Sequence, residues 1–178
     1  MRVLVLGLAA SLTFAGMATA ATTRAELTAP ITAFNDAFAK GDLKAAAAAY
    51  APDVSIIDEV PPYSWRGPAA FTTWAQDLTA NDKKLGVTGE KLTLGDVVRT
   101  ETDGRHAYVV MAVVYEFTAK GAPMHENARM TFALHKGTDG WKIAGWTFTS
   151  ARASAGAAPA AKPAAAKPAA AKPPTAKP

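Results

Sequence analysis

Asp58 is the acid whose position most favours chemistry, because it ends the apolar run at residues 54–57. Pro61 and Pro62 shape the loop that follows it. A carboxylate beside apolar walls has its charged form disfavoured, which tunes its pKa toward general-base work near neutral pH. The alternative is a solvated strand-end aspartate that accepts hydrogen bonds from loop amides. The residues alone leave both interpretations open.

Aromatic side chains form a second group that could build a site. Their spacing would gather them between a helical layer and a sheet, where most aromatic residues are simply core. Trp65 fits neither helix nor strand core, because prolines and Gly67 surround it, and it is expected over the mouth of a pocket. The candidate ligand-binding residues are Phe34, Phe38, Tyr50, Trp65, Trp74, Tyr115, Met130, Phe132 and Trp146.

The sequence contains few features that would indicate a metal site or a cofactor site. The chain has no cysteine, which excludes disulfides, thiolate zinc sites, iron–sulfur clusters and a cysteine nucleophile. His106 and His135 are expected to be cross-strand neighbours, but no carboxylate ligand is evident beside them. No nucleotide-binding glycine loop, nucleophile elbow or H-E-x-x-H motif is present. We therefore expect neither a metal nor a cofactor.

Three helices are predicted before the period of the sequence changes. Thr23 and Glu26 have capping-box spacing, but Pro30 predicts that this first helix is broken and begins again near Thr28. Gly41 ends it and Asp42 caps a second helix. That helix is expected to bury Leu43, Ala46, Ala47 and Tyr50. The third helix opens with Pro68 at its first position and carries the stripe Phe71, Trp74 and Leu78.

Strands are predicted at residues 54–58 and then, from Gly89 onward, at four consecutive segments. Asp103-Gly104 and Asp139-Gly140 are hairpin dipeptides, so the four strands form an antiparallel meander. The segment 107–117 is apolar on both faces, which favours a homodimer through the sheet. The four expected strands span residues 90–102, 105–118, 124–136 and 141–150.

The two ends of the chain are expected to lie outside the fold. Residues 1–20 resemble a cleavable secretory signal, so we expect a periplasmic or secreted protein. Residues 151–178 contain 14 Ala and 6 Pro and predict a disordered, low-complexity tail. Residues 21–150 hold 13 Lys and Arg against 15 Asp and Glu, so the basic balance belongs to the tail. The domain therefore shows no sign of a nucleic-acid surface.

The chain resembles a known superfamily at three stretches: AKGDLKAAAAAYAPDVSIID, WRGPAAFTTW and RMTFALHKGTDGWKIAGWTF. Over residues 24–150 it is similar to nuclear transport factor 2-like proteins, closest to their SnoaL-like and ketosteroid-isomerase-like branch. The resemblance implies a cone-shaped α+β roll with a deep cavity, commonly dimeric through its sheet. Three N-terminal helices would pack on a curved, mainly antiparallel sheet in the order α-α-β-α-β-β-β-β.

The same resemblance bears on catalysis. Ketosteroid isomerases carry an aspartate base 17 residues after the glycine of a Gly-Asp pair, and here that position is Asp58. Their oxyanion hole is a tyrosine and a protonated aspartate. Those positions fall at Phe34 and at Met130 or Arg129, so both donors are missing and steroid isomerisation is not expected.

Three functions remain open from the sequence. The first is a secreted domain that binds a small, largely apolar molecule without established catalysis. The second is an isomerase-, cyclase- or hydrolase-type enzyme that uses Asp58 as general base on a polyketide-like or other carbonyl substrate, with Tyr50, Tyr115 or Trp65 as donor. The third is an envelope-associated dimeric adaptor whose cationic tail contacts anionic envelope polymers.

Overall fold

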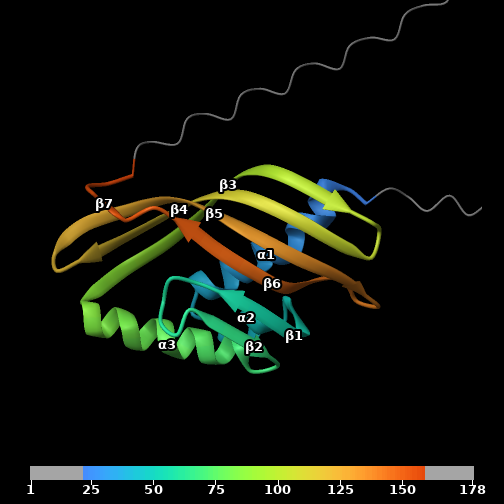
Figure 1. The fold of residues 1–178 in the computed structure, drawn as a ribbon, viewed down its shortest axis with the longest axis horizontal. Helices are drawn as coiled ribbons and strands as arrows, with labels where there is room; N and C mark the ends of the chain where they lie inside the picture. Colours follow the sequence, from blue (N-terminus) through green and yellow to red (C-terminus); the bar gives the residue numbers. More distant parts are fainter. Residues whose placement is uncertain (1–21, 159–178) are drawn as a thin grey trace, which may run out of the picture.

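The computed structural model describes residues 22–158, which form a curved sheet with helices on its concave side (Figure 1). The predicted features at residues 1–20 and 159–178 lie outside this range. The helices are α1 (Arg24–Ala39), α2 (Leu43–Ala47) and α3 (Ala70–Leu85). The strands are β1 (Tyr50–Ile57), β2 (Ser64–Gly67), β3 (Val87–Thr102), β4 (His106–Ala119), β5 (Ala122–Gly137), β6 (Gly140–Ser150) and β7 (Ser154–Ala155).

The sheet follows the order β2-β1-β6-β5-β4-β3, with β7 paired to β5. All neighbours are antiparallel except β1 and β6, which run parallel. The α+β class and the predicted meander of four long strands are confirmed, as is the pairing of His106 with His135. The predicted order omitted β2 and β7, which are short and carry little periodic signal.

Helix α1 begins with the capping box expected from Thr23 and Glu26, whose two reciprocal bonds measure 2.6 and 3.2 Å. The predicted break at Pro30 is wrong, because α1 runs through it. Leu27, Ile31 and Phe34 are buried on one face across the proline, and this packing holds both halves in one helix.

Helix α2 is shorter than the sequence suggested. Asp42 caps it through a 2.9 Å bond from the Ala45 amide. Only Ala46 of its own residues is buried; Leu43 is 49% exposed, which corrects the predicted inward face. A five-residue helix has room for one inward position before the chain enters β1 at Tyr50.

Helix α3 starts later than predicted, since Ala69 rather than Gly67 precedes its first turn. Phe71 and Trp74 are buried as expected, and Leu78 packs against the core. The helix ends at Gly86, whose φ of 68° is left-handed. Figure 1 shows α3 lying below the long curved strands.

Strand β1 reaches its place through an unusually close approach to β6. A Cβ added to Gly145 would stand 2.6 Å from the Ser55 carbonyl oxygen. Only glycine therefore fits beside the parallel pairing of Ser55 with Gly145. This contact fixes the end of β1, where Asp58 follows.

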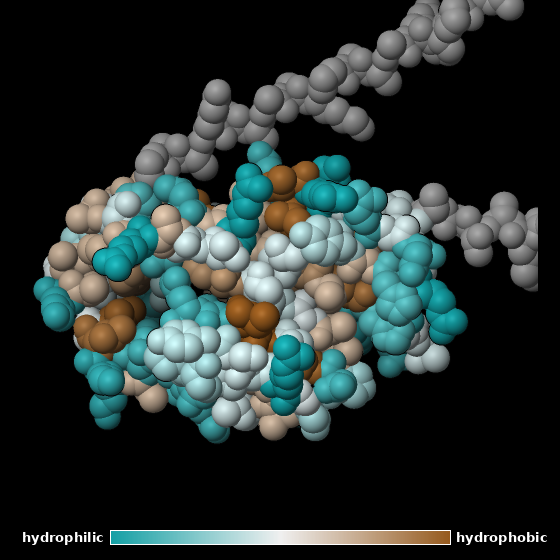
Figure 2. Space-filling view, in the orientation of Figure 1, coloured by the Kyte–Doolittle hydropathy of each residue, from teal (hydrophilic) through white to brown (hydrophobic). Residues whose placement is uncertain are grey.

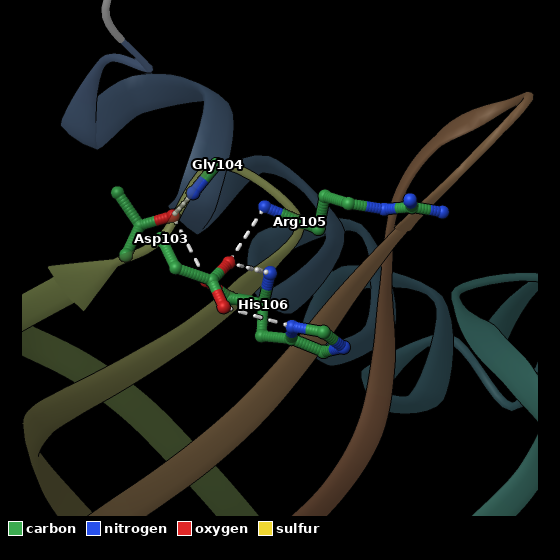
Figure 3. A network of polar contacts seen from close by, with 5 residues as sticks. Asp103, Gly104, Arg105 and His106 are labelled. Carbon is green, nitrogen blue, oxygen red and sulfur yellow. Dashed lines mark hydrogen bonds and ion pairs between the residues drawn. The ribbon is translucent and has the colours of Figure 1, made fainter.

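The turn between β3 and β4 is held by a compact network of polar contacts (Figure 3). The Asp103 carboxylate accepts from the amides of Arg105 and His106 at 2.8 and 2.7 Å, and its other oxygen lies 3.0 Å from His106 Nδ1. The Gly104 amide donates to the Thr102 hydroxyl. The bonds from His106 and Arg105 hold the pKa of Asp103 well below its usual range.

The chain remains in contact with the domain beyond residue 150, where the sequence predicted a disordered tail. Strand β7 pairs Ser154 with His125, and His125 Nδ1 lies 2.9 Å from the Gly156 carbonyl oxygen. Alanine is the only apolar residue type in residues 151–158, so no larger side chain signalled this contact, which depends on backbone groups.

Candidate functional site

A cavity of about 1470 Å³ lies between α1, α3 and the inner face of the sheet. Figure 2 shows the surface hollowed between the strands and α3. Apolar and aromatic side chains make up much of its wall, as ligand pockets commonly require. The seven aromatic residues that line it are Phe34, Phe38, Trp74, Tyr115, Phe117, Trp146 and Phe148.

Asp58 lines this cavity directly after β1. Its Oδ2 accepts a 2.7 Å bond from the Trp74 indole, and its Oδ1 accepts a 2.8 Å bond from the Glu59 amide. Burial raises the pKa of Asp58, while these two bonds counteract part of that effect. The carboxyl group is therefore held in one orientation, close to apolar walls.

Glu59 and Glu126 bring two further acids beside Asp58. Glu126 is only 8% exposed, and its Oε2 accepts a 2.6 Å bond from the Ser150 hydroxyl. Partial loss of solvent, together with the facing Glu126 carboxylate, raises the pKa of Glu59 to about 7. Proton uptake by Glu59 relieves the repulsion between the two carboxylates.

A second acidic pair lies toward the end of α3. Asp82 is 9% exposed, and burial together with Glu90 raises its pKa to about 7. Tyr115 also lines the cavity, and burial together with the charges of Asp82 and Glu90 raises the pKa of its hydroxyl. Tyr115 can therefore act only as a neutral hydrogen-bonding group at physiological pH.

Six of the nine candidate ligand-binding residues line the cavity: Phe34, Phe38, Trp74, Tyr115, Met130 and Trp146. The other three lie elsewhere. Tyr50 is buried and accepts a 2.8 Å bond from the Trp146 indole. Trp65, expected at the mouth, is buried at β2 and donates to Asp77 at 2.8 Å. Phe132 is fully enclosed in the core.

Sequence reasoning missed the acids that accompany Asp58, although two carried a signal. Asp82 follows Trp74 and Leu78 at successive i+4 steps, so it continues the buried stripe of α3. Glu126 shares the strand parity of Met130, which lines the cavity. Charged residues in a strand usually face water, and Arg129 on the opposite parity does.

The resemblance to ketosteroid isomerases pairs their two oxyanion donors with Phe34 and with Met130 or Arg129. Phe34 and Met130 line the cavity and offer no donor, and Arg129 is exposed. No group of three or more His, Asp or Glu side chains in residues 22–158 is arranged to hold a metal ion. None of the helices in this range is long and apolar enough to cross a membrane.

Comparisons with known proteins agree with this architecture. A family of proteins described as having a SnoaL-like domain matches residues 27–151. Among curated proteins, no sequence matches this chain significantly.

Solved structures share the fold at low sequence identity. A ketosteroid isomerase-like protein from Erwinia carotovora atroseptica is 21% identical, with a TM-score of 0.55, over 71% of this chain and 94% of that one. A hexachlorocyclohexane dehydrochlorinase is 14% identical, with a TM-score of 0.62, over 79% and 93%. The CaMKII hub of S. rosetta is 22% identical, with a TM-score of 0.60, over 75% and 100%.

Proposed function

The chain belongs to the SnoaL-like domain family, and we propose that its domain binds a small, largely apolar molecule in the cavity between helices and sheet. The observation that carries this proposal is the cavity itself, about 1470 Å³ with seven aromatic side chains in its wall. A space of this size, with apolar side chains in much of its wall and a few polar groups among them, suits an organic ligand.

Native mass spectrometry of the protein purified from its own source tests this proposal. We expect an additional bound mass in the wild type and its loss in Leu78→Trp, which adds bulk to the cavity wall. Leu43→Trp is the matched control, because Leu43 is exposed on α2 and does not line the cavity. A bound mass that persists unchanged in Leu78→Trp would place the ligand elsewhere.

An enzyme that uses Asp58 as general base is the second candidate function. It is favoured by one observation: the Trp74 indole and the Glu59 amide fix the Asp58 carboxyl inside the cavity. Tyr115 supplies a hydroxyl on the cavity wall as hydrogen-bond donor, whereas Tyr50 and Trp65 lie outside it. The substrate would carry an acidic C–H beside a carbonyl, as in polyketide-like molecules.

Asp58→Asn separates this candidate from simple binding, because it removes the base and keeps the shape of the side chain. We expect turnover of the identified ligand to fall about 100-fold or more, with binding retained. Asp77→Asn is the control, since Asp77 also accepts from a tryptophan but lies outside the cavity. Equal turnover in Asp58→Asn and wild type would leave binding as the function.

The location and assembly of the protein are further proposals. From residues 1–20 we propose export, to be tested by fractionation and by an N-terminus at Ala21 in the mature protein.

From the outer sheet face, where Val98 and Tyr108 are 48% and 43% exposed, we propose a homodimer. Light scattering of wild type and Tyr108→Lys tests it, with monomers expected for the variant.

The cationic tail motivates one more proposal, contact with anionic envelope polymers. Its lysines lie at residues 162, 167, 172 and 177, outside the described residues. Retention on anionic vesicles, measured with and without residues 159–178, tests it. Equal retention of the two proteins rejects the adaptor function.

A further inference from the structure

The cavity carries acids that the domain itself does not neutralise. Five of its lining residues are acidic: Asp58, Glu59, Asp82, Glu90 and Glu126. Within residues 22–158, ion pairs at 4.0 Å or less join only Lys91 to Glu116, Arg99 to Glu101 and His106 to Asp103. None of these pairs includes a cavity acid.

Asp82 and Glu126 make this imbalance costly, because they are 9% and 8% exposed. Glu126 accepts from the Ser150 hydroxyl, and Asp82 faces Glu90 and Asn81. A buried carboxylate without a counter-charge is destabilising unless it binds a proton or a cation. The cations on the cavity wall are Lys83, Lys91 and Arg152, and Lys91 lies 3.9 Å from Glu116 instead.

The aromatic wall adds an independent preference for positive charge. The Trp74 and Trp146 rings meet edge to face at 5.1 Å, and Tyr115 stacks on Phe117 at 5.0 Å. The face of an aromatic ring carries a negative quadrupole, so it attracts an ammonium group, most strongly where water is excluded. Carboxylates and aromatic faces thus favour the same kind of ligand.

Other ligand charges fit these surroundings less well. An anionic ligand would add to the repulsion among the five acids. A metal ion needs three converging ligands, and residues 22–158 offer no such group. A neutral apolar molecule would fill the aromatic part and leave the buried carboxylates uncompensated.

We propose that the cavity binds an organic cation, an amine or quaternary ammonium group attached to an apolar body. The positive group lies among Asp58, Asp82 and Glu126, and the apolar body packs against the aromatic wall. This inference rests on the proposed function, because it names the class of ligand that the same cavity takes.

The test uses three probes of one length on the purified protein: a phenylalkyl trimethylammonium ion, its neutral tert-butyl isostere and the corresponding carboxylate. Titration calorimetry and ligand-detected NMR give the affinities. We expect the cation to bind about tenfold more tightly than the neutral isostere, and the carboxylate to bind weakest.

Two isosteric variants assign the effect to the acids. Glu126→Gln and Asp82→Asn should each lower the affinity for the cation about tenfold. Each should leave the affinity for the neutral probe within about twofold of the wild-type value. Asp96→Asn is the matched control, since Asp96 is exposed on β3 and does not line the cavity. Circular dichroism confirms that each variant folds.

Proton release provides a readout that packing alone does not produce. Cation binding should expel protons from Glu59 and Asp82 near pH 6.5, because each has a pKa of about 7 in the free protein. Calorimetry in buffers of different ionisation enthalpy measures this release. Tyr115, Lys83, Lys91 and Arg152 also line the cavity.

The outcomes separate the two proposals. Equal affinity for the cation and the neutral isostere would overturn the proposal of an organic-cation ligand. It would leave the proposal of an apolar ligand-binding cavity in place. Failure of all three probes to bind counts against the proposed function as well. Cation preference that survives unchanged in both Glu126→Gln and Asp82→Asn also overturns the assignment.

Discussion

Two aspartates at strand ends behave in opposite ways in this molecule. Asp103 precedes β4 and accepts from Arg105 and His106, two and three residues away, which lowers its pKa. Asp58 follows β1 and accepts from Trp74, 16 residues away, inside a cavity where burial raises its pKa. Both are well hydrogen-bonded, so the number of bonds does not explain the difference.

Solvent and distance along the chain explain it. The Asp103 carboxylate stands in water, and every partner lies within its own turn, so it stabilises a local shape. The surroundings of Asp58 are assembled from α3, β5 and β6, and they withhold water and counter-charge. A buried acid such as Asp58 lowers the stability of the fold, but its raised pKa brings it closer to the range useful for proton transfer. Such perturbed acids are typical of functional sites.

Gly145→Ala should disrupt the Asp58 region most strongly, because its Cβ would stand 2.6 Å from the Ser55 carbonyl. We expect a loss of about 3 kcal/mol in the free energy of unfolding, with β1 displaced from β6. Chemical denaturation measures it. Gly137→Ala is the control, since its Cβ would meet nothing closer than 4.0 Å. NMR should show the Asp103 turn unchanged; coupled loss of both regions would contradict the separation.

Trp74→Phe removes one hydrogen bond from a buried carboxyl and keeps an aromatic ring. We expect the pKa of Asp58 to rise further and the free energy of unfolding to fall by about 1–3 kcal/mol. Carbon-13 NMR titration of the Asp58 carboxyl measures the shift. Trp65→Phe is a closely matched control, because it removes the bond to Asp77 outside the cavity. If both variants shifted the pKa of Asp58 equally, the shift could not be assigned to the loss of the Trp74 hydrogen bond.

The cavity acids should make the domain less stable as the pH rises. Unfolded carboxyls titrate near pH 4, whereas Glu59 and Asp82 keep protons up to about 7 in the folded state. Between these values the folded state binds more protons, so unfolding free energy falls with rising pH. Midpoints of urea denaturation from pH 4 to 8 measure this trend. Glu59→Gln with Asp82→Asn should flatten it; an unchanged slope would contradict it.

Asp103→Asn should have the smallest effect on stability. Asp103 also contributes a pH dependence of stability opposite in sign to that of the cavity acids. A lowered pKa stabilises the fold above about pH 4 and loses this contribution as the pH falls further. The variant keeps one acceptor oxygen for the turn amides, so we expect only a slight loss near pH 7. Below about pH 4, the unfolding free energy of the variant should therefore fall less steeply with falling pH than that of wild type. A change in ligand affinity would show that the two regions are coupled.

The same contrast explains what the sequence predicted. The hairpin at Asp103-Gly104 and the four long strands follow from signals within a few residues, and the structure confirms them. The position of Asp58 was predicted as well, through a spacing of 17 residues from Gly41. These features need only local patterns, or a local pattern shared with a family.

Features that depend on distant parts of the chain were missed. Glu126 was not predicted to face inward, because its hydrogen-bond partner, the Ser150 hydroxyl, lies 24 residues further along the chain. Trp65 was placed at the pocket mouth because nothing predicted β2. The continuous α1 likewise depends on core packing around Pro30, which overrides the local preference of proline.

The edge-to-face pair of Trp74 and Trp146 has an optical consequence. Two of the four tryptophans line the cavity, while Trp65 and Trp141 lie outside it. We expect two indoles with centroids 5.1 Å apart to couple their electronic transitions and to give a signed couplet in ultraviolet circular dichroism. A molecule that enters and tilts either ring changes that couplet and the emission of both. The tryptophan pair would therefore report, without a label, whether a ligand occupies the cavity.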